Sequence, residues 1–287
     1  MRIAISSILW PAEVSLTEIA ETAAEIGYEG LEGVRDFMGN VVGLRELLGD
    51  QGLAMAAGYF AANWFDADYR APELAGLRRS AEFYADVGAE TVILASAGSP
   101  RRVATAGFHP DHRADGLTDY QWGYFCESLN LAADICLDEF GLPVAFKQHA
   151  GSYVEIASEV ETFMTGTNPD TVLLAADTGH LFYAGIDPID FFERNIDRIG
   201  YVHFRDVDTD VFDEGMAEEV GLRDFVETEG FTEIGAGFMD LEAIVECLNG
   251  SDYDGWVTLT QDYSSRDATV AAGNSLEYAE SLLTGQG

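Results

Sequence analysis

The sequence predicts a single (β/α)8 barrel, and three observations carry the prediction. Short apolar runs alternate with amphipathic segments along the whole chain of 287 residues. Eight such pairs can be counted, which is the number that a closed barrel of parallel strands requires. No linker or shift in composition divides residues 1–287, so one domain is expected.

An open, doubly wound sheet is the alternative fold. Such sheets commonly place a G-x-G-x-x-G loop after their first strand, where it binds the phosphates of a nucleotide. The sequence has no such loop after residues 2–7. The barrel is therefore favoured, and no nucleotide cofactor is expected.

The expected strands are short runs of apolar and β-branched residues. This pattern is typical of parallel strands that are buried on both faces. The chain opens with the first of them, Arg2-Ile3-Ala4-Ile5. Together the expected strands cover residues 2–7, 28–33, 53–59, 91–95, 144–148, 172–176, 201–204 and 256–260.

The expected helices are identified by their ends. Ser15 and Glu18 have the spacing of a capping box, in which each side chain bonds the other residue's backbone N–H at the start of a helix. Gly27 ends this helix, because glycine readily adopts the left-handed conformation after a last turn. Together the expected helices cover residues 15–26, 41–51, 72–87, 120–140, 154–164, 188–195, 241–248 and 268–283.

Two longer segments show no clear periodicity. Residues 96–118 are polar and rich in glycine, and they follow the fourth expected strand. Residues 208–237 are acidic and follow the seventh. We expect the second segment to be an insertion that forms a loop over the mouth of the barrel.

The charge balance is strongly acidic. The chain has 51 Asp and Glu residues against 15 Lys and Arg, a formal net charge of −36. Such a surface repels itself at low ionic strength, whereas at molar salt the screening length shrinks to about 3 Å. The composition therefore predicts a halophilic protein of a high-salt cytoplasm.

The composition also excludes several classes of partner. Nucleic acid requires a basic face, which this chain cannot build. No apolar run approaches the roughly 20 residues that span a bilayer, and the first residues resemble a strand and not a signal peptide. The three cysteines lack metal-ligand spacing and are expected to be structural thiols. A homo-oligomer remains compatible with the sequence.

One residue is singled out by composition alone. Fourteen of the 15 basic residues are arginines, and Lys147 is the single lysine. A chain that carries no other lysine is expected to keep this one for a specific role. A structural salt bridge inside the barrel is the alternative.

The reactive groups of such barrels lie at the carboxyl ends of the strands. His149, His180 and His203 all fall at expected strand ends, and His109 and His112 fall in the loop after the fourth strand. Histidine with carboxylate suits a divalent metal such as Mn, Co, Fe or Zn. The same residue types suit general acid and base catalysis.

Four segments resemble a known family in the right order. Residues 147–155, K-Q-H-A-G-S-Y-V-E, resemble the H-x-H-x-G-T-x-x-E segment of inosose dehydratases and related xylose-isomerase-like barrels. Residues 177–180, D-T-G-H, resemble their D-T-G-H segment, and residues 202–206 resemble V-H-x-K-D. Residues 255–262 resemble G-W-x-x-x-E-Q-D.

The resemblance implies a divalent metal held by four strand ends. Asp177 and His203 match two of the ligand positions. Lys147 and Thr260 stand where the other two ligands are expected. An ammonium group cannot bind a metal, and a threonine hydroxyl is a poor ligand.

The resemblance also implies roles in catalysis and substrate binding. It implies that Glu155 is a base or substrate ligand, and that His180 contacts a substrate hydroxyl or transfers a proton. The reaction would remove a proton α to the carbonyl of a sugar or cyclitol and stabilise the enediolate, which leads to isomerisation, epimerisation or dehydration. Apart from the resemblance, the residues near strand ends give the expected substrate contacts, which are His149, Asp206, Gln261, Trp10 and Glu32.

Three interpretations of the site stay open. In the first, Lys147 replaces the metal and stabilises the enediolate electrostatically. In the second, a metal binds through a shifted set such as His149, Asp177 and His203, with Glu155 or Asp262. In the third, the barrel has lost catalysis and only binds or senses a sugar. An endonuclease of the same superfamily is disfavoured by the acidic charge.

Overall fold

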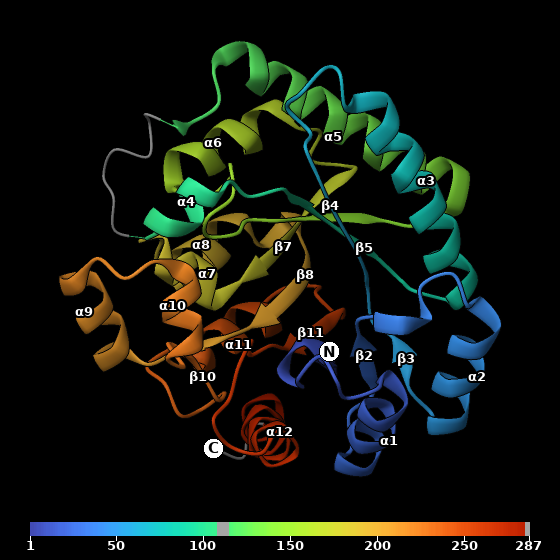
Figure 1. Ribbon diagram of the computed structural model, residues 1–287, viewed down its shortest axis with the longest axis vertical. Coiled ribbons are helices and arrows are strands. Elements are labelled where there is room, and N and C mark those ends of the chain that lie inside the picture. Colours follow the sequence, from blue (N-terminus) through green and yellow to red (C-terminus); the bar gives the residue numbers. More distant parts are fainter. Residues whose placement is uncertain (108–114, 285–287) are drawn as a thin grey trace.

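The computed structural model describes residues 1–107 and 115–284, and its centre is a parallel sheet closed into a barrel with helices around it (Figure 1). The strands follow the order β3-β2-β1-β11-β8-β7-β6-β5-β4, and every neighbouring pair is parallel. The (β/α)8 prediction is confirmed. The strands are β1 (Arg2–Ser6), β2 (Gly30–Glu32), β3 (Ala54–Met55), β4 (Gly58–Ala62), β5 (Val92–Ser96), β6 (Val144–Lys147), β7 (Val172–Asp177), β8 (Ile199–Phe204) and β11 (Trp256–Leu259).

The third predicted strand is divided into two short strands. β3 pairs with β2 and β4 pairs with β5, and only Ala56 and Ala57 separate them. A side chain at Gly58 would overlap the ring of Tyr84, so glycine lets the strand pass close to this tyrosine. β3 and β4 together therefore take the place of one barrel strand. In this way the nine strands fill the eight positions of the ring.

Most helices lie where the sequence predicts them. The capping box of Ser15 and Glu18 is formed, and Gly27 ends the helix with a φ of 116°. The outer helices are α1 (Leu16–Ile26), α2 (Val41–Gln51), α3 (Arg70–Val87), α5 (Asp119–Phe140), α6 (Ala157–Gly166), α8 (Pro188–Asn195), α11 (Leu241–Asn249) and α12 (Ala268–Thr284).

Helix α6 begins three residues later than predicted. The carboxylate of Glu159 accepts the backbone N–H groups of Glu155 and Ile156, which caps the helix at its first turn. The apolar residues before this point belong to the loop after β6. The prediction of a helix from residue 154 was therefore wrong by one turn.

The loops carry further short elements that the sequence did not indicate. The segment after β5 contains α4 (Pro100–Thr105), and α7 (Thr178–Tyr183) follows β7 directly. Short 3-10 helices occur at Ser7–Leu9, Arg35–Phe37 and Ile196–Arg198. These elements depend on contacts with distant parts of the chain, so local periodicity does not reveal them.

The acidic insertion is mostly helical, so the expectation of a loop was wrong in secondary structure. It contains α9 (Thr209–Glu218) and α10 (Leu222–Glu227), and β9 (Asp206–Val207) pairs antiparallel with β10 (Phe231–Thr232). Phe225 packs against both Phe231 and Tyr183 of α7. This aromatic cluster attaches the insertion to the barrel. In the described part of the chain, no helix combines the length and apolar character needed to cross a membrane.

Candidate active site

The centre of the candidate site is the carboxylate of Asp177, at the end of β7. Lys147 ends the neighbouring strand β6, and its Nζ lies 2.9 Å from Asp177 Oδ2. Arg205 Nε donates to the same oxygen at 3.3 Å. The other oxygen accepts the backbone N–H of His180 at 3.0 Å. Both carboxylate oxygens are therefore engaged, and one of them by two cations.

The two cations determine the protonation of Asp177. Its side chain is fully buried, and burial alone would raise its pKa. The charges of Lys147 and Arg205 outweigh this effect and hold the pKa of Asp177 well below its usual value. Asp177 is therefore an anion, paired with cations in a buried site.

Arg205 connects three strand ends, although it was not among the site residues predicted from the sequence. Besides Asp177, its guanidinium donates to Thr260 Oγ1 at 3.1 Å and forms an ion pair with Asp262. A side chain at Gly179 would overlap the aliphatic part of Arg205, so this glycine leaves room for it. The only sequence signal for Arg205 was its place in residues 202–206, which resemble V-H-x-K-D. Arg205 stands where that pattern has its lysine.

A second buried pair joins β2 to β8. Glu32 Oε2 lies 2.9 Å from His203 Nε2. Burial would raise the pKa of Glu32, but His203 and then Lys147 outweigh it, and the pKa is lowered. Lys147 therefore acts electrostatically on both Glu32 and Asp177, as a single cation serving two buried carboxylates.

Two predicted site residues, His149 and His180, lie against each other. Their ring centroids are 3.7 Å apart. His149 Nδ1 lies 2.7 Å from the carbonyl oxygen of Ala150, and since a carbonyl only accepts, Nδ1 carries the proton and Nε2 of the neutral ring keeps its lone pair. Burial and the charge of Lys147 lower the pKa of His149 to about 4. Burial and then His149 hold the pKa of His180 well below its usual value.

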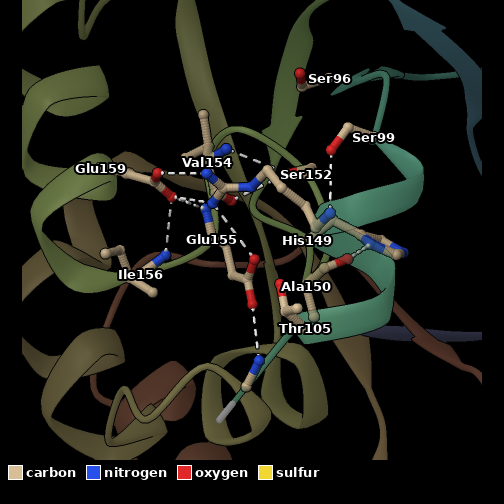
Figure 2. A network of polar contacts seen from close by, with 12 residues as sticks. Ser96, Ser99, Thr105, His149, Ala150, Ser152, Val154, Glu155, Ile156 and Glu159 are labelled. Atoms are coloured by element: carbon tan, nitrogen blue, oxygen red, sulfur yellow. Dashed lines mark hydrogen bonds and ion pairs between the residues drawn. The ribbon is translucent and has the colours of Figure 1, made fainter. Parts of the chain in front are cut away.

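Glu155 lies in a buried ion-pair network and not on an open surface (Figure 2). One oxygen accepts the backbone N–H of Gly107 at 3.0 Å, and the other lies 3.4 Å from Arg102 Nη2. Arg102 forms a two-pronged bond with Glu159, at 2.9 and 2.7 Å. Burial raises the pKa of Glu155 to about 7. With an exposed fraction of 0%, Glu155 fastens α4 to the β6 loop, and this geometry does not favour it as a base.

Asp206 is also engaged by the protein itself. Its two carboxylate oxygens accept four backbone N–H groups at 2.9 to 3.0 Å. These donors belong to Val207, Gly235, Gly237 and Met239. Asp206 therefore shapes the loop after β10, and its expected contact with substrate is not favoured.

The remaining predicted contacts lie near the ends of β1 and β11. Trp10 and Asp262 line a cavity of about 870 Å³. Gln261 donates through Nε2 to Tyr263 O at 2.9 Å, and its Oε1 is buried with no hydrogen-bond partner in the described residues. His109 and His112 lie outside the described residues.

The residues at the strand ends do not fit the divalent metal that the family resemblance implies. Two cations occupy the Asp177 carboxylate, and the Thr260 hydroxyl accepts from Arg205. The shifted set of His149, Asp177 and His203 does not fit a metal either, because His203 is hydrogen-bonded to Glu32. Across residues 1–107 and 115–284, no three His, Cys, Asp or Glu side chains form a group that could hold a metal ion.

Comparison with known proteins agrees with the fold. A sequence model described as "Xylose isomerase-like TIM barrel" matches residues 20–282. An inosose dehydratase of Geobacillus kaustophilus is 32% identical over 274 residues, which cover 93% of this chain and 87% of that protein. An inosose dehydratase of Lacticaseibacillus casei is 29% identical over 268 residues, with coverages of 93% and 87%.

Two solved structures share the architecture at low sequence identity. The apo crystal structure of an E. coli 3-keto-D-glucoside 4-epimerase has a TM-score of 0.75 at 17% identity, covering 98% of this chain and 99% of that one. The IOLI protein with a bound zinc atom has a TM-score of 0.76 at 15% identity, covering 99% of both chains. The chain belongs to the xylose isomerase-like TIM barrel family.

Proposed function

We propose that this barrel is a dehydratase that removes water from an inosose or a closely related keto-cyclitol. The relatives with the higher sequence identities are inosose dehydratases that match over 93% of the chain. The observation that carries the proposal is the Lys147–Asp177 ion pair beside a neutral His149. This arrangement supplies a cation and a proton acceptor, which are the two groups that enediolate chemistry needs.

Lys147 stabilises the negative charge that develops on the keto oxygen. A buried ammonium group is preorganised for this task and acts strongly, because little water screens it. Asp177 fixes the ammonium in place, and Arg205 holds Asp177 from the other side. The solved structure of the IOLI protein contains a bound zinc atom, but the residues here do not fit a divalent cation, so no step depends on one.

His149 is the proton acceptor. Its Nδ1–H is held by the Ala150 carbonyl, and Nε2 therefore presents its lone pair. The lowered pKa of about 4 keeps the ring neutral at pH 7 and makes the protonated ring a strong acid. Such a group accepts a proton when a cation assists, and afterwards it protonates a poor leaving group.

The reaction balances with these residues alone. His149 Nε2 takes the proton from the carbon α to the ketone, and the electron pair moves onto the keto oxygen beside Lys147. The pair then returns to re-form the carbonyl, a double bond forms between the α and β carbons, and the β-hydroxyl leaves. The imidazolium gives its proton to this hydroxyl, so the products are an enone and water.

The test is dehydration of an inosose, followed through the ultraviolet absorbance of the conjugated product in concentrated KCl. We expect turnover by the wild type, and a loss in kcat of about a hundred-fold or more for Lys147→Met. Arg45→Met is the matched control, because Arg45 is an exposed basic residue on α2, and it should behave as wild type. Binding of inososes and keto-sugars without turnover of any of them would identify a binding barrel and overturn the proposal.

A further inference from the structure

Arg35 makes an unusual set of contacts at the edge of the mouth. Its guanidinium donates to four backbone carbonyl oxygens, those of Ser7, Trp10, Pro11 and Val14, at 2.5, 2.6, 2.9 and 3.0 Å. In a chain with 51 acidic residues, an arginine would be expected to find a carboxylate. Within the described residues, no carboxylate lies at ion-pair distance from Arg35.

The backbone at Arg35 is strained in order to reach these carbonyls. Its φ is +38°, in the left-handed region that residues other than glycine rarely adopt. Gly33, two residues earlier, has a φ of +118°, and a side chain there would overlap Ser7. The segment after β2 is therefore shaped to bring one guanidinium under the loop after β1.

The four acceptors all belong to the loop that follows β1. Residues 7–14 contain only one short 3-10 helix, Ser7–Leu9, and the Pro11 carbonyl also accepts the backbone N–H of Val14 at 3.1 Å. A guanidinium offers five N–H donors in a fixed planar fork. Arg35 uses this fork as a clamp: its Nη1 and Nη2 groups hold four carbonyl oxygens of one loop in a fixed arrangement.

The clamped loop forms a wall of a cavity that Asp262 of the candidate site also lines. Ser7, Trp10, Pro11 and Val14 all line the 870 Å³ cavity, together with Asp262. Asp262 is paired with Arg205, which in turn bonds Asp177. The position of Trp10 relative to the reacting groups therefore depends on how residues 7–14 are held.

We infer that Arg35 is a positioning residue of the active site, which holds Trp10 and its loop as a fixed wall against the ring of the substrate. The inference rests on the proposed dehydratase function. Arg35 does not touch the reacting atoms, so it acts on substrate binding more than on the chemical step. A lysine cannot replace it, because one ammonium group cannot reach four carbonyls in a planar arrangement.

The first measurement is steady-state kinetics of Arg35→Lys with the substrate that the wild type dehydrates. We expect KM to rise about ten-fold while kcat stays within about three-fold, because a displaced wall weakens binding and leaves Lys147 and His149 in place. Arg45→Lys, on the exposed face of α2, is the control and should leave both constants unchanged. An unchanged KM in Arg35→Lys would overturn the inference.

A double-mutant cycle separates positioning from a general loss of stability. If Arg35 acts through Trp10, the rise in KM caused by Arg35→Lys should largely disappear in a Trp10→Ala background. Independent, additive effects of the two substitutions would overturn the inference, even if each lowers the melting temperature. If the wild type dehydrates the substrate and the two effects are additive, only this inference is overturned. If the wild type shows no turnover, the proposed function and this inference are overturned together.

Discussion

Lys147 Nζ and Asp177 Oδ2 lie 2.9 Å apart at the carboxyl ends of neighbouring strands, and both side chains are buried. The single lysine of a very acidic chain is thus placed in the barrel and not on its surface. Arg205 contacts the same carboxylate, so the pair is part of a larger set of charges. This set occupies the place where the family resemblance implies a metal.

Asp177→Asn should destabilise the fold, because it removes the anion that is paired directly with the buried Lys147 ammonium at 2.9 Å. Removal of one partner of a buried pair typically costs about 3 to 5 kcal/mol in free energy of unfolding. We expect a loss in this range by urea denaturation in concentrated KCl. Asp190→Asn, which removes an exposed pair with Arg194, is the control and should have little effect.

The double variant Lys147→Met with Asp177→Asn provides the internal check. It removes the unpaired charge together with its partner, so its stability should recover a large part of the loss. If the double variant is as unstable as the sum of the single variants, the two residues do not act as a pair.

Metal analysis should separate this barrel from one that depends on a metal. We expect protein purified without chelators to contain far less than one equivalent of Mn, Co, Fe or Zn. Dialysis against EDTA should leave the dehydratase rate unchanged, because Lys147 and Arg205 already neutralise Asp177. One equivalent of bound metal, with activity lost on its removal, would contradict this prediction.

How far the sequence predicts the structure depends on how local each feature is. Helix α2 was predicted at Val41–Gln51 and α8 at Pro188–Asn195, as observed, because caps and breakers near each end determine them. The division of the third strand and the helices α9 and α10 were missed. The division of the strand depends on close packing with Tyr84, and the two helices depend on the aromatic cluster around Phe225. The periodicity of apolar residues along the chain carries no information on such contacts.

The same distinction applies to the site. The strand-end rule brought Lys147, Asp177 and the two histidines His149 and His180 to one place, because topology alone fixes where strands end. It could not show which side chains pair across the barrel, such as Glu32 with His203, which are 171 positions apart. Nor could it show the ion pair of Glu155, because the partner is Arg102 of α4, which lies 53 positions away.

Glu155 should give the stability of the protein a characteristic pH dependence. Burial raises its pKa from 4.5 to about 7. Between these values the folded protein holds a proton that the unfolded chain has released, so the free energy of unfolding falls as pH rises through this window and levels off above it. We expect Glu155→Gln to reduce this fall in the free energy of unfolding, because a glutamine side chain does not titrate. Its amide oxygen can still accept the backbone N–H of Gly107.

Urea denaturation at pH 5, 6, 7 and 8 measures this effect for the wild type and the variant. Glu139→Gln is the control, because Glu139 is an exposed acid paired with Arg78. Parallel pH profiles for wild type and Glu155→Gln would show that the carboxyl group does not titrate in this window.

Thermal stability should increase steeply with salt. A formal charge of −36 on one chain makes the folded state repel itself, and the repulsion weakens as the screening length falls from about 10 Å at 0.1 M salt to about 3 Å at 1 M. We expect the melting temperature to rise continuously over this range of KCl, and sucrose at equal osmolality to raise it much less. The prediction fails if the melting temperature is the same at both salt concentrations, or if sucrose raises it as much as KCl does. Either result would mean that charge repulsion does not limit stability. The acidic surface would then be no adaptation to salt.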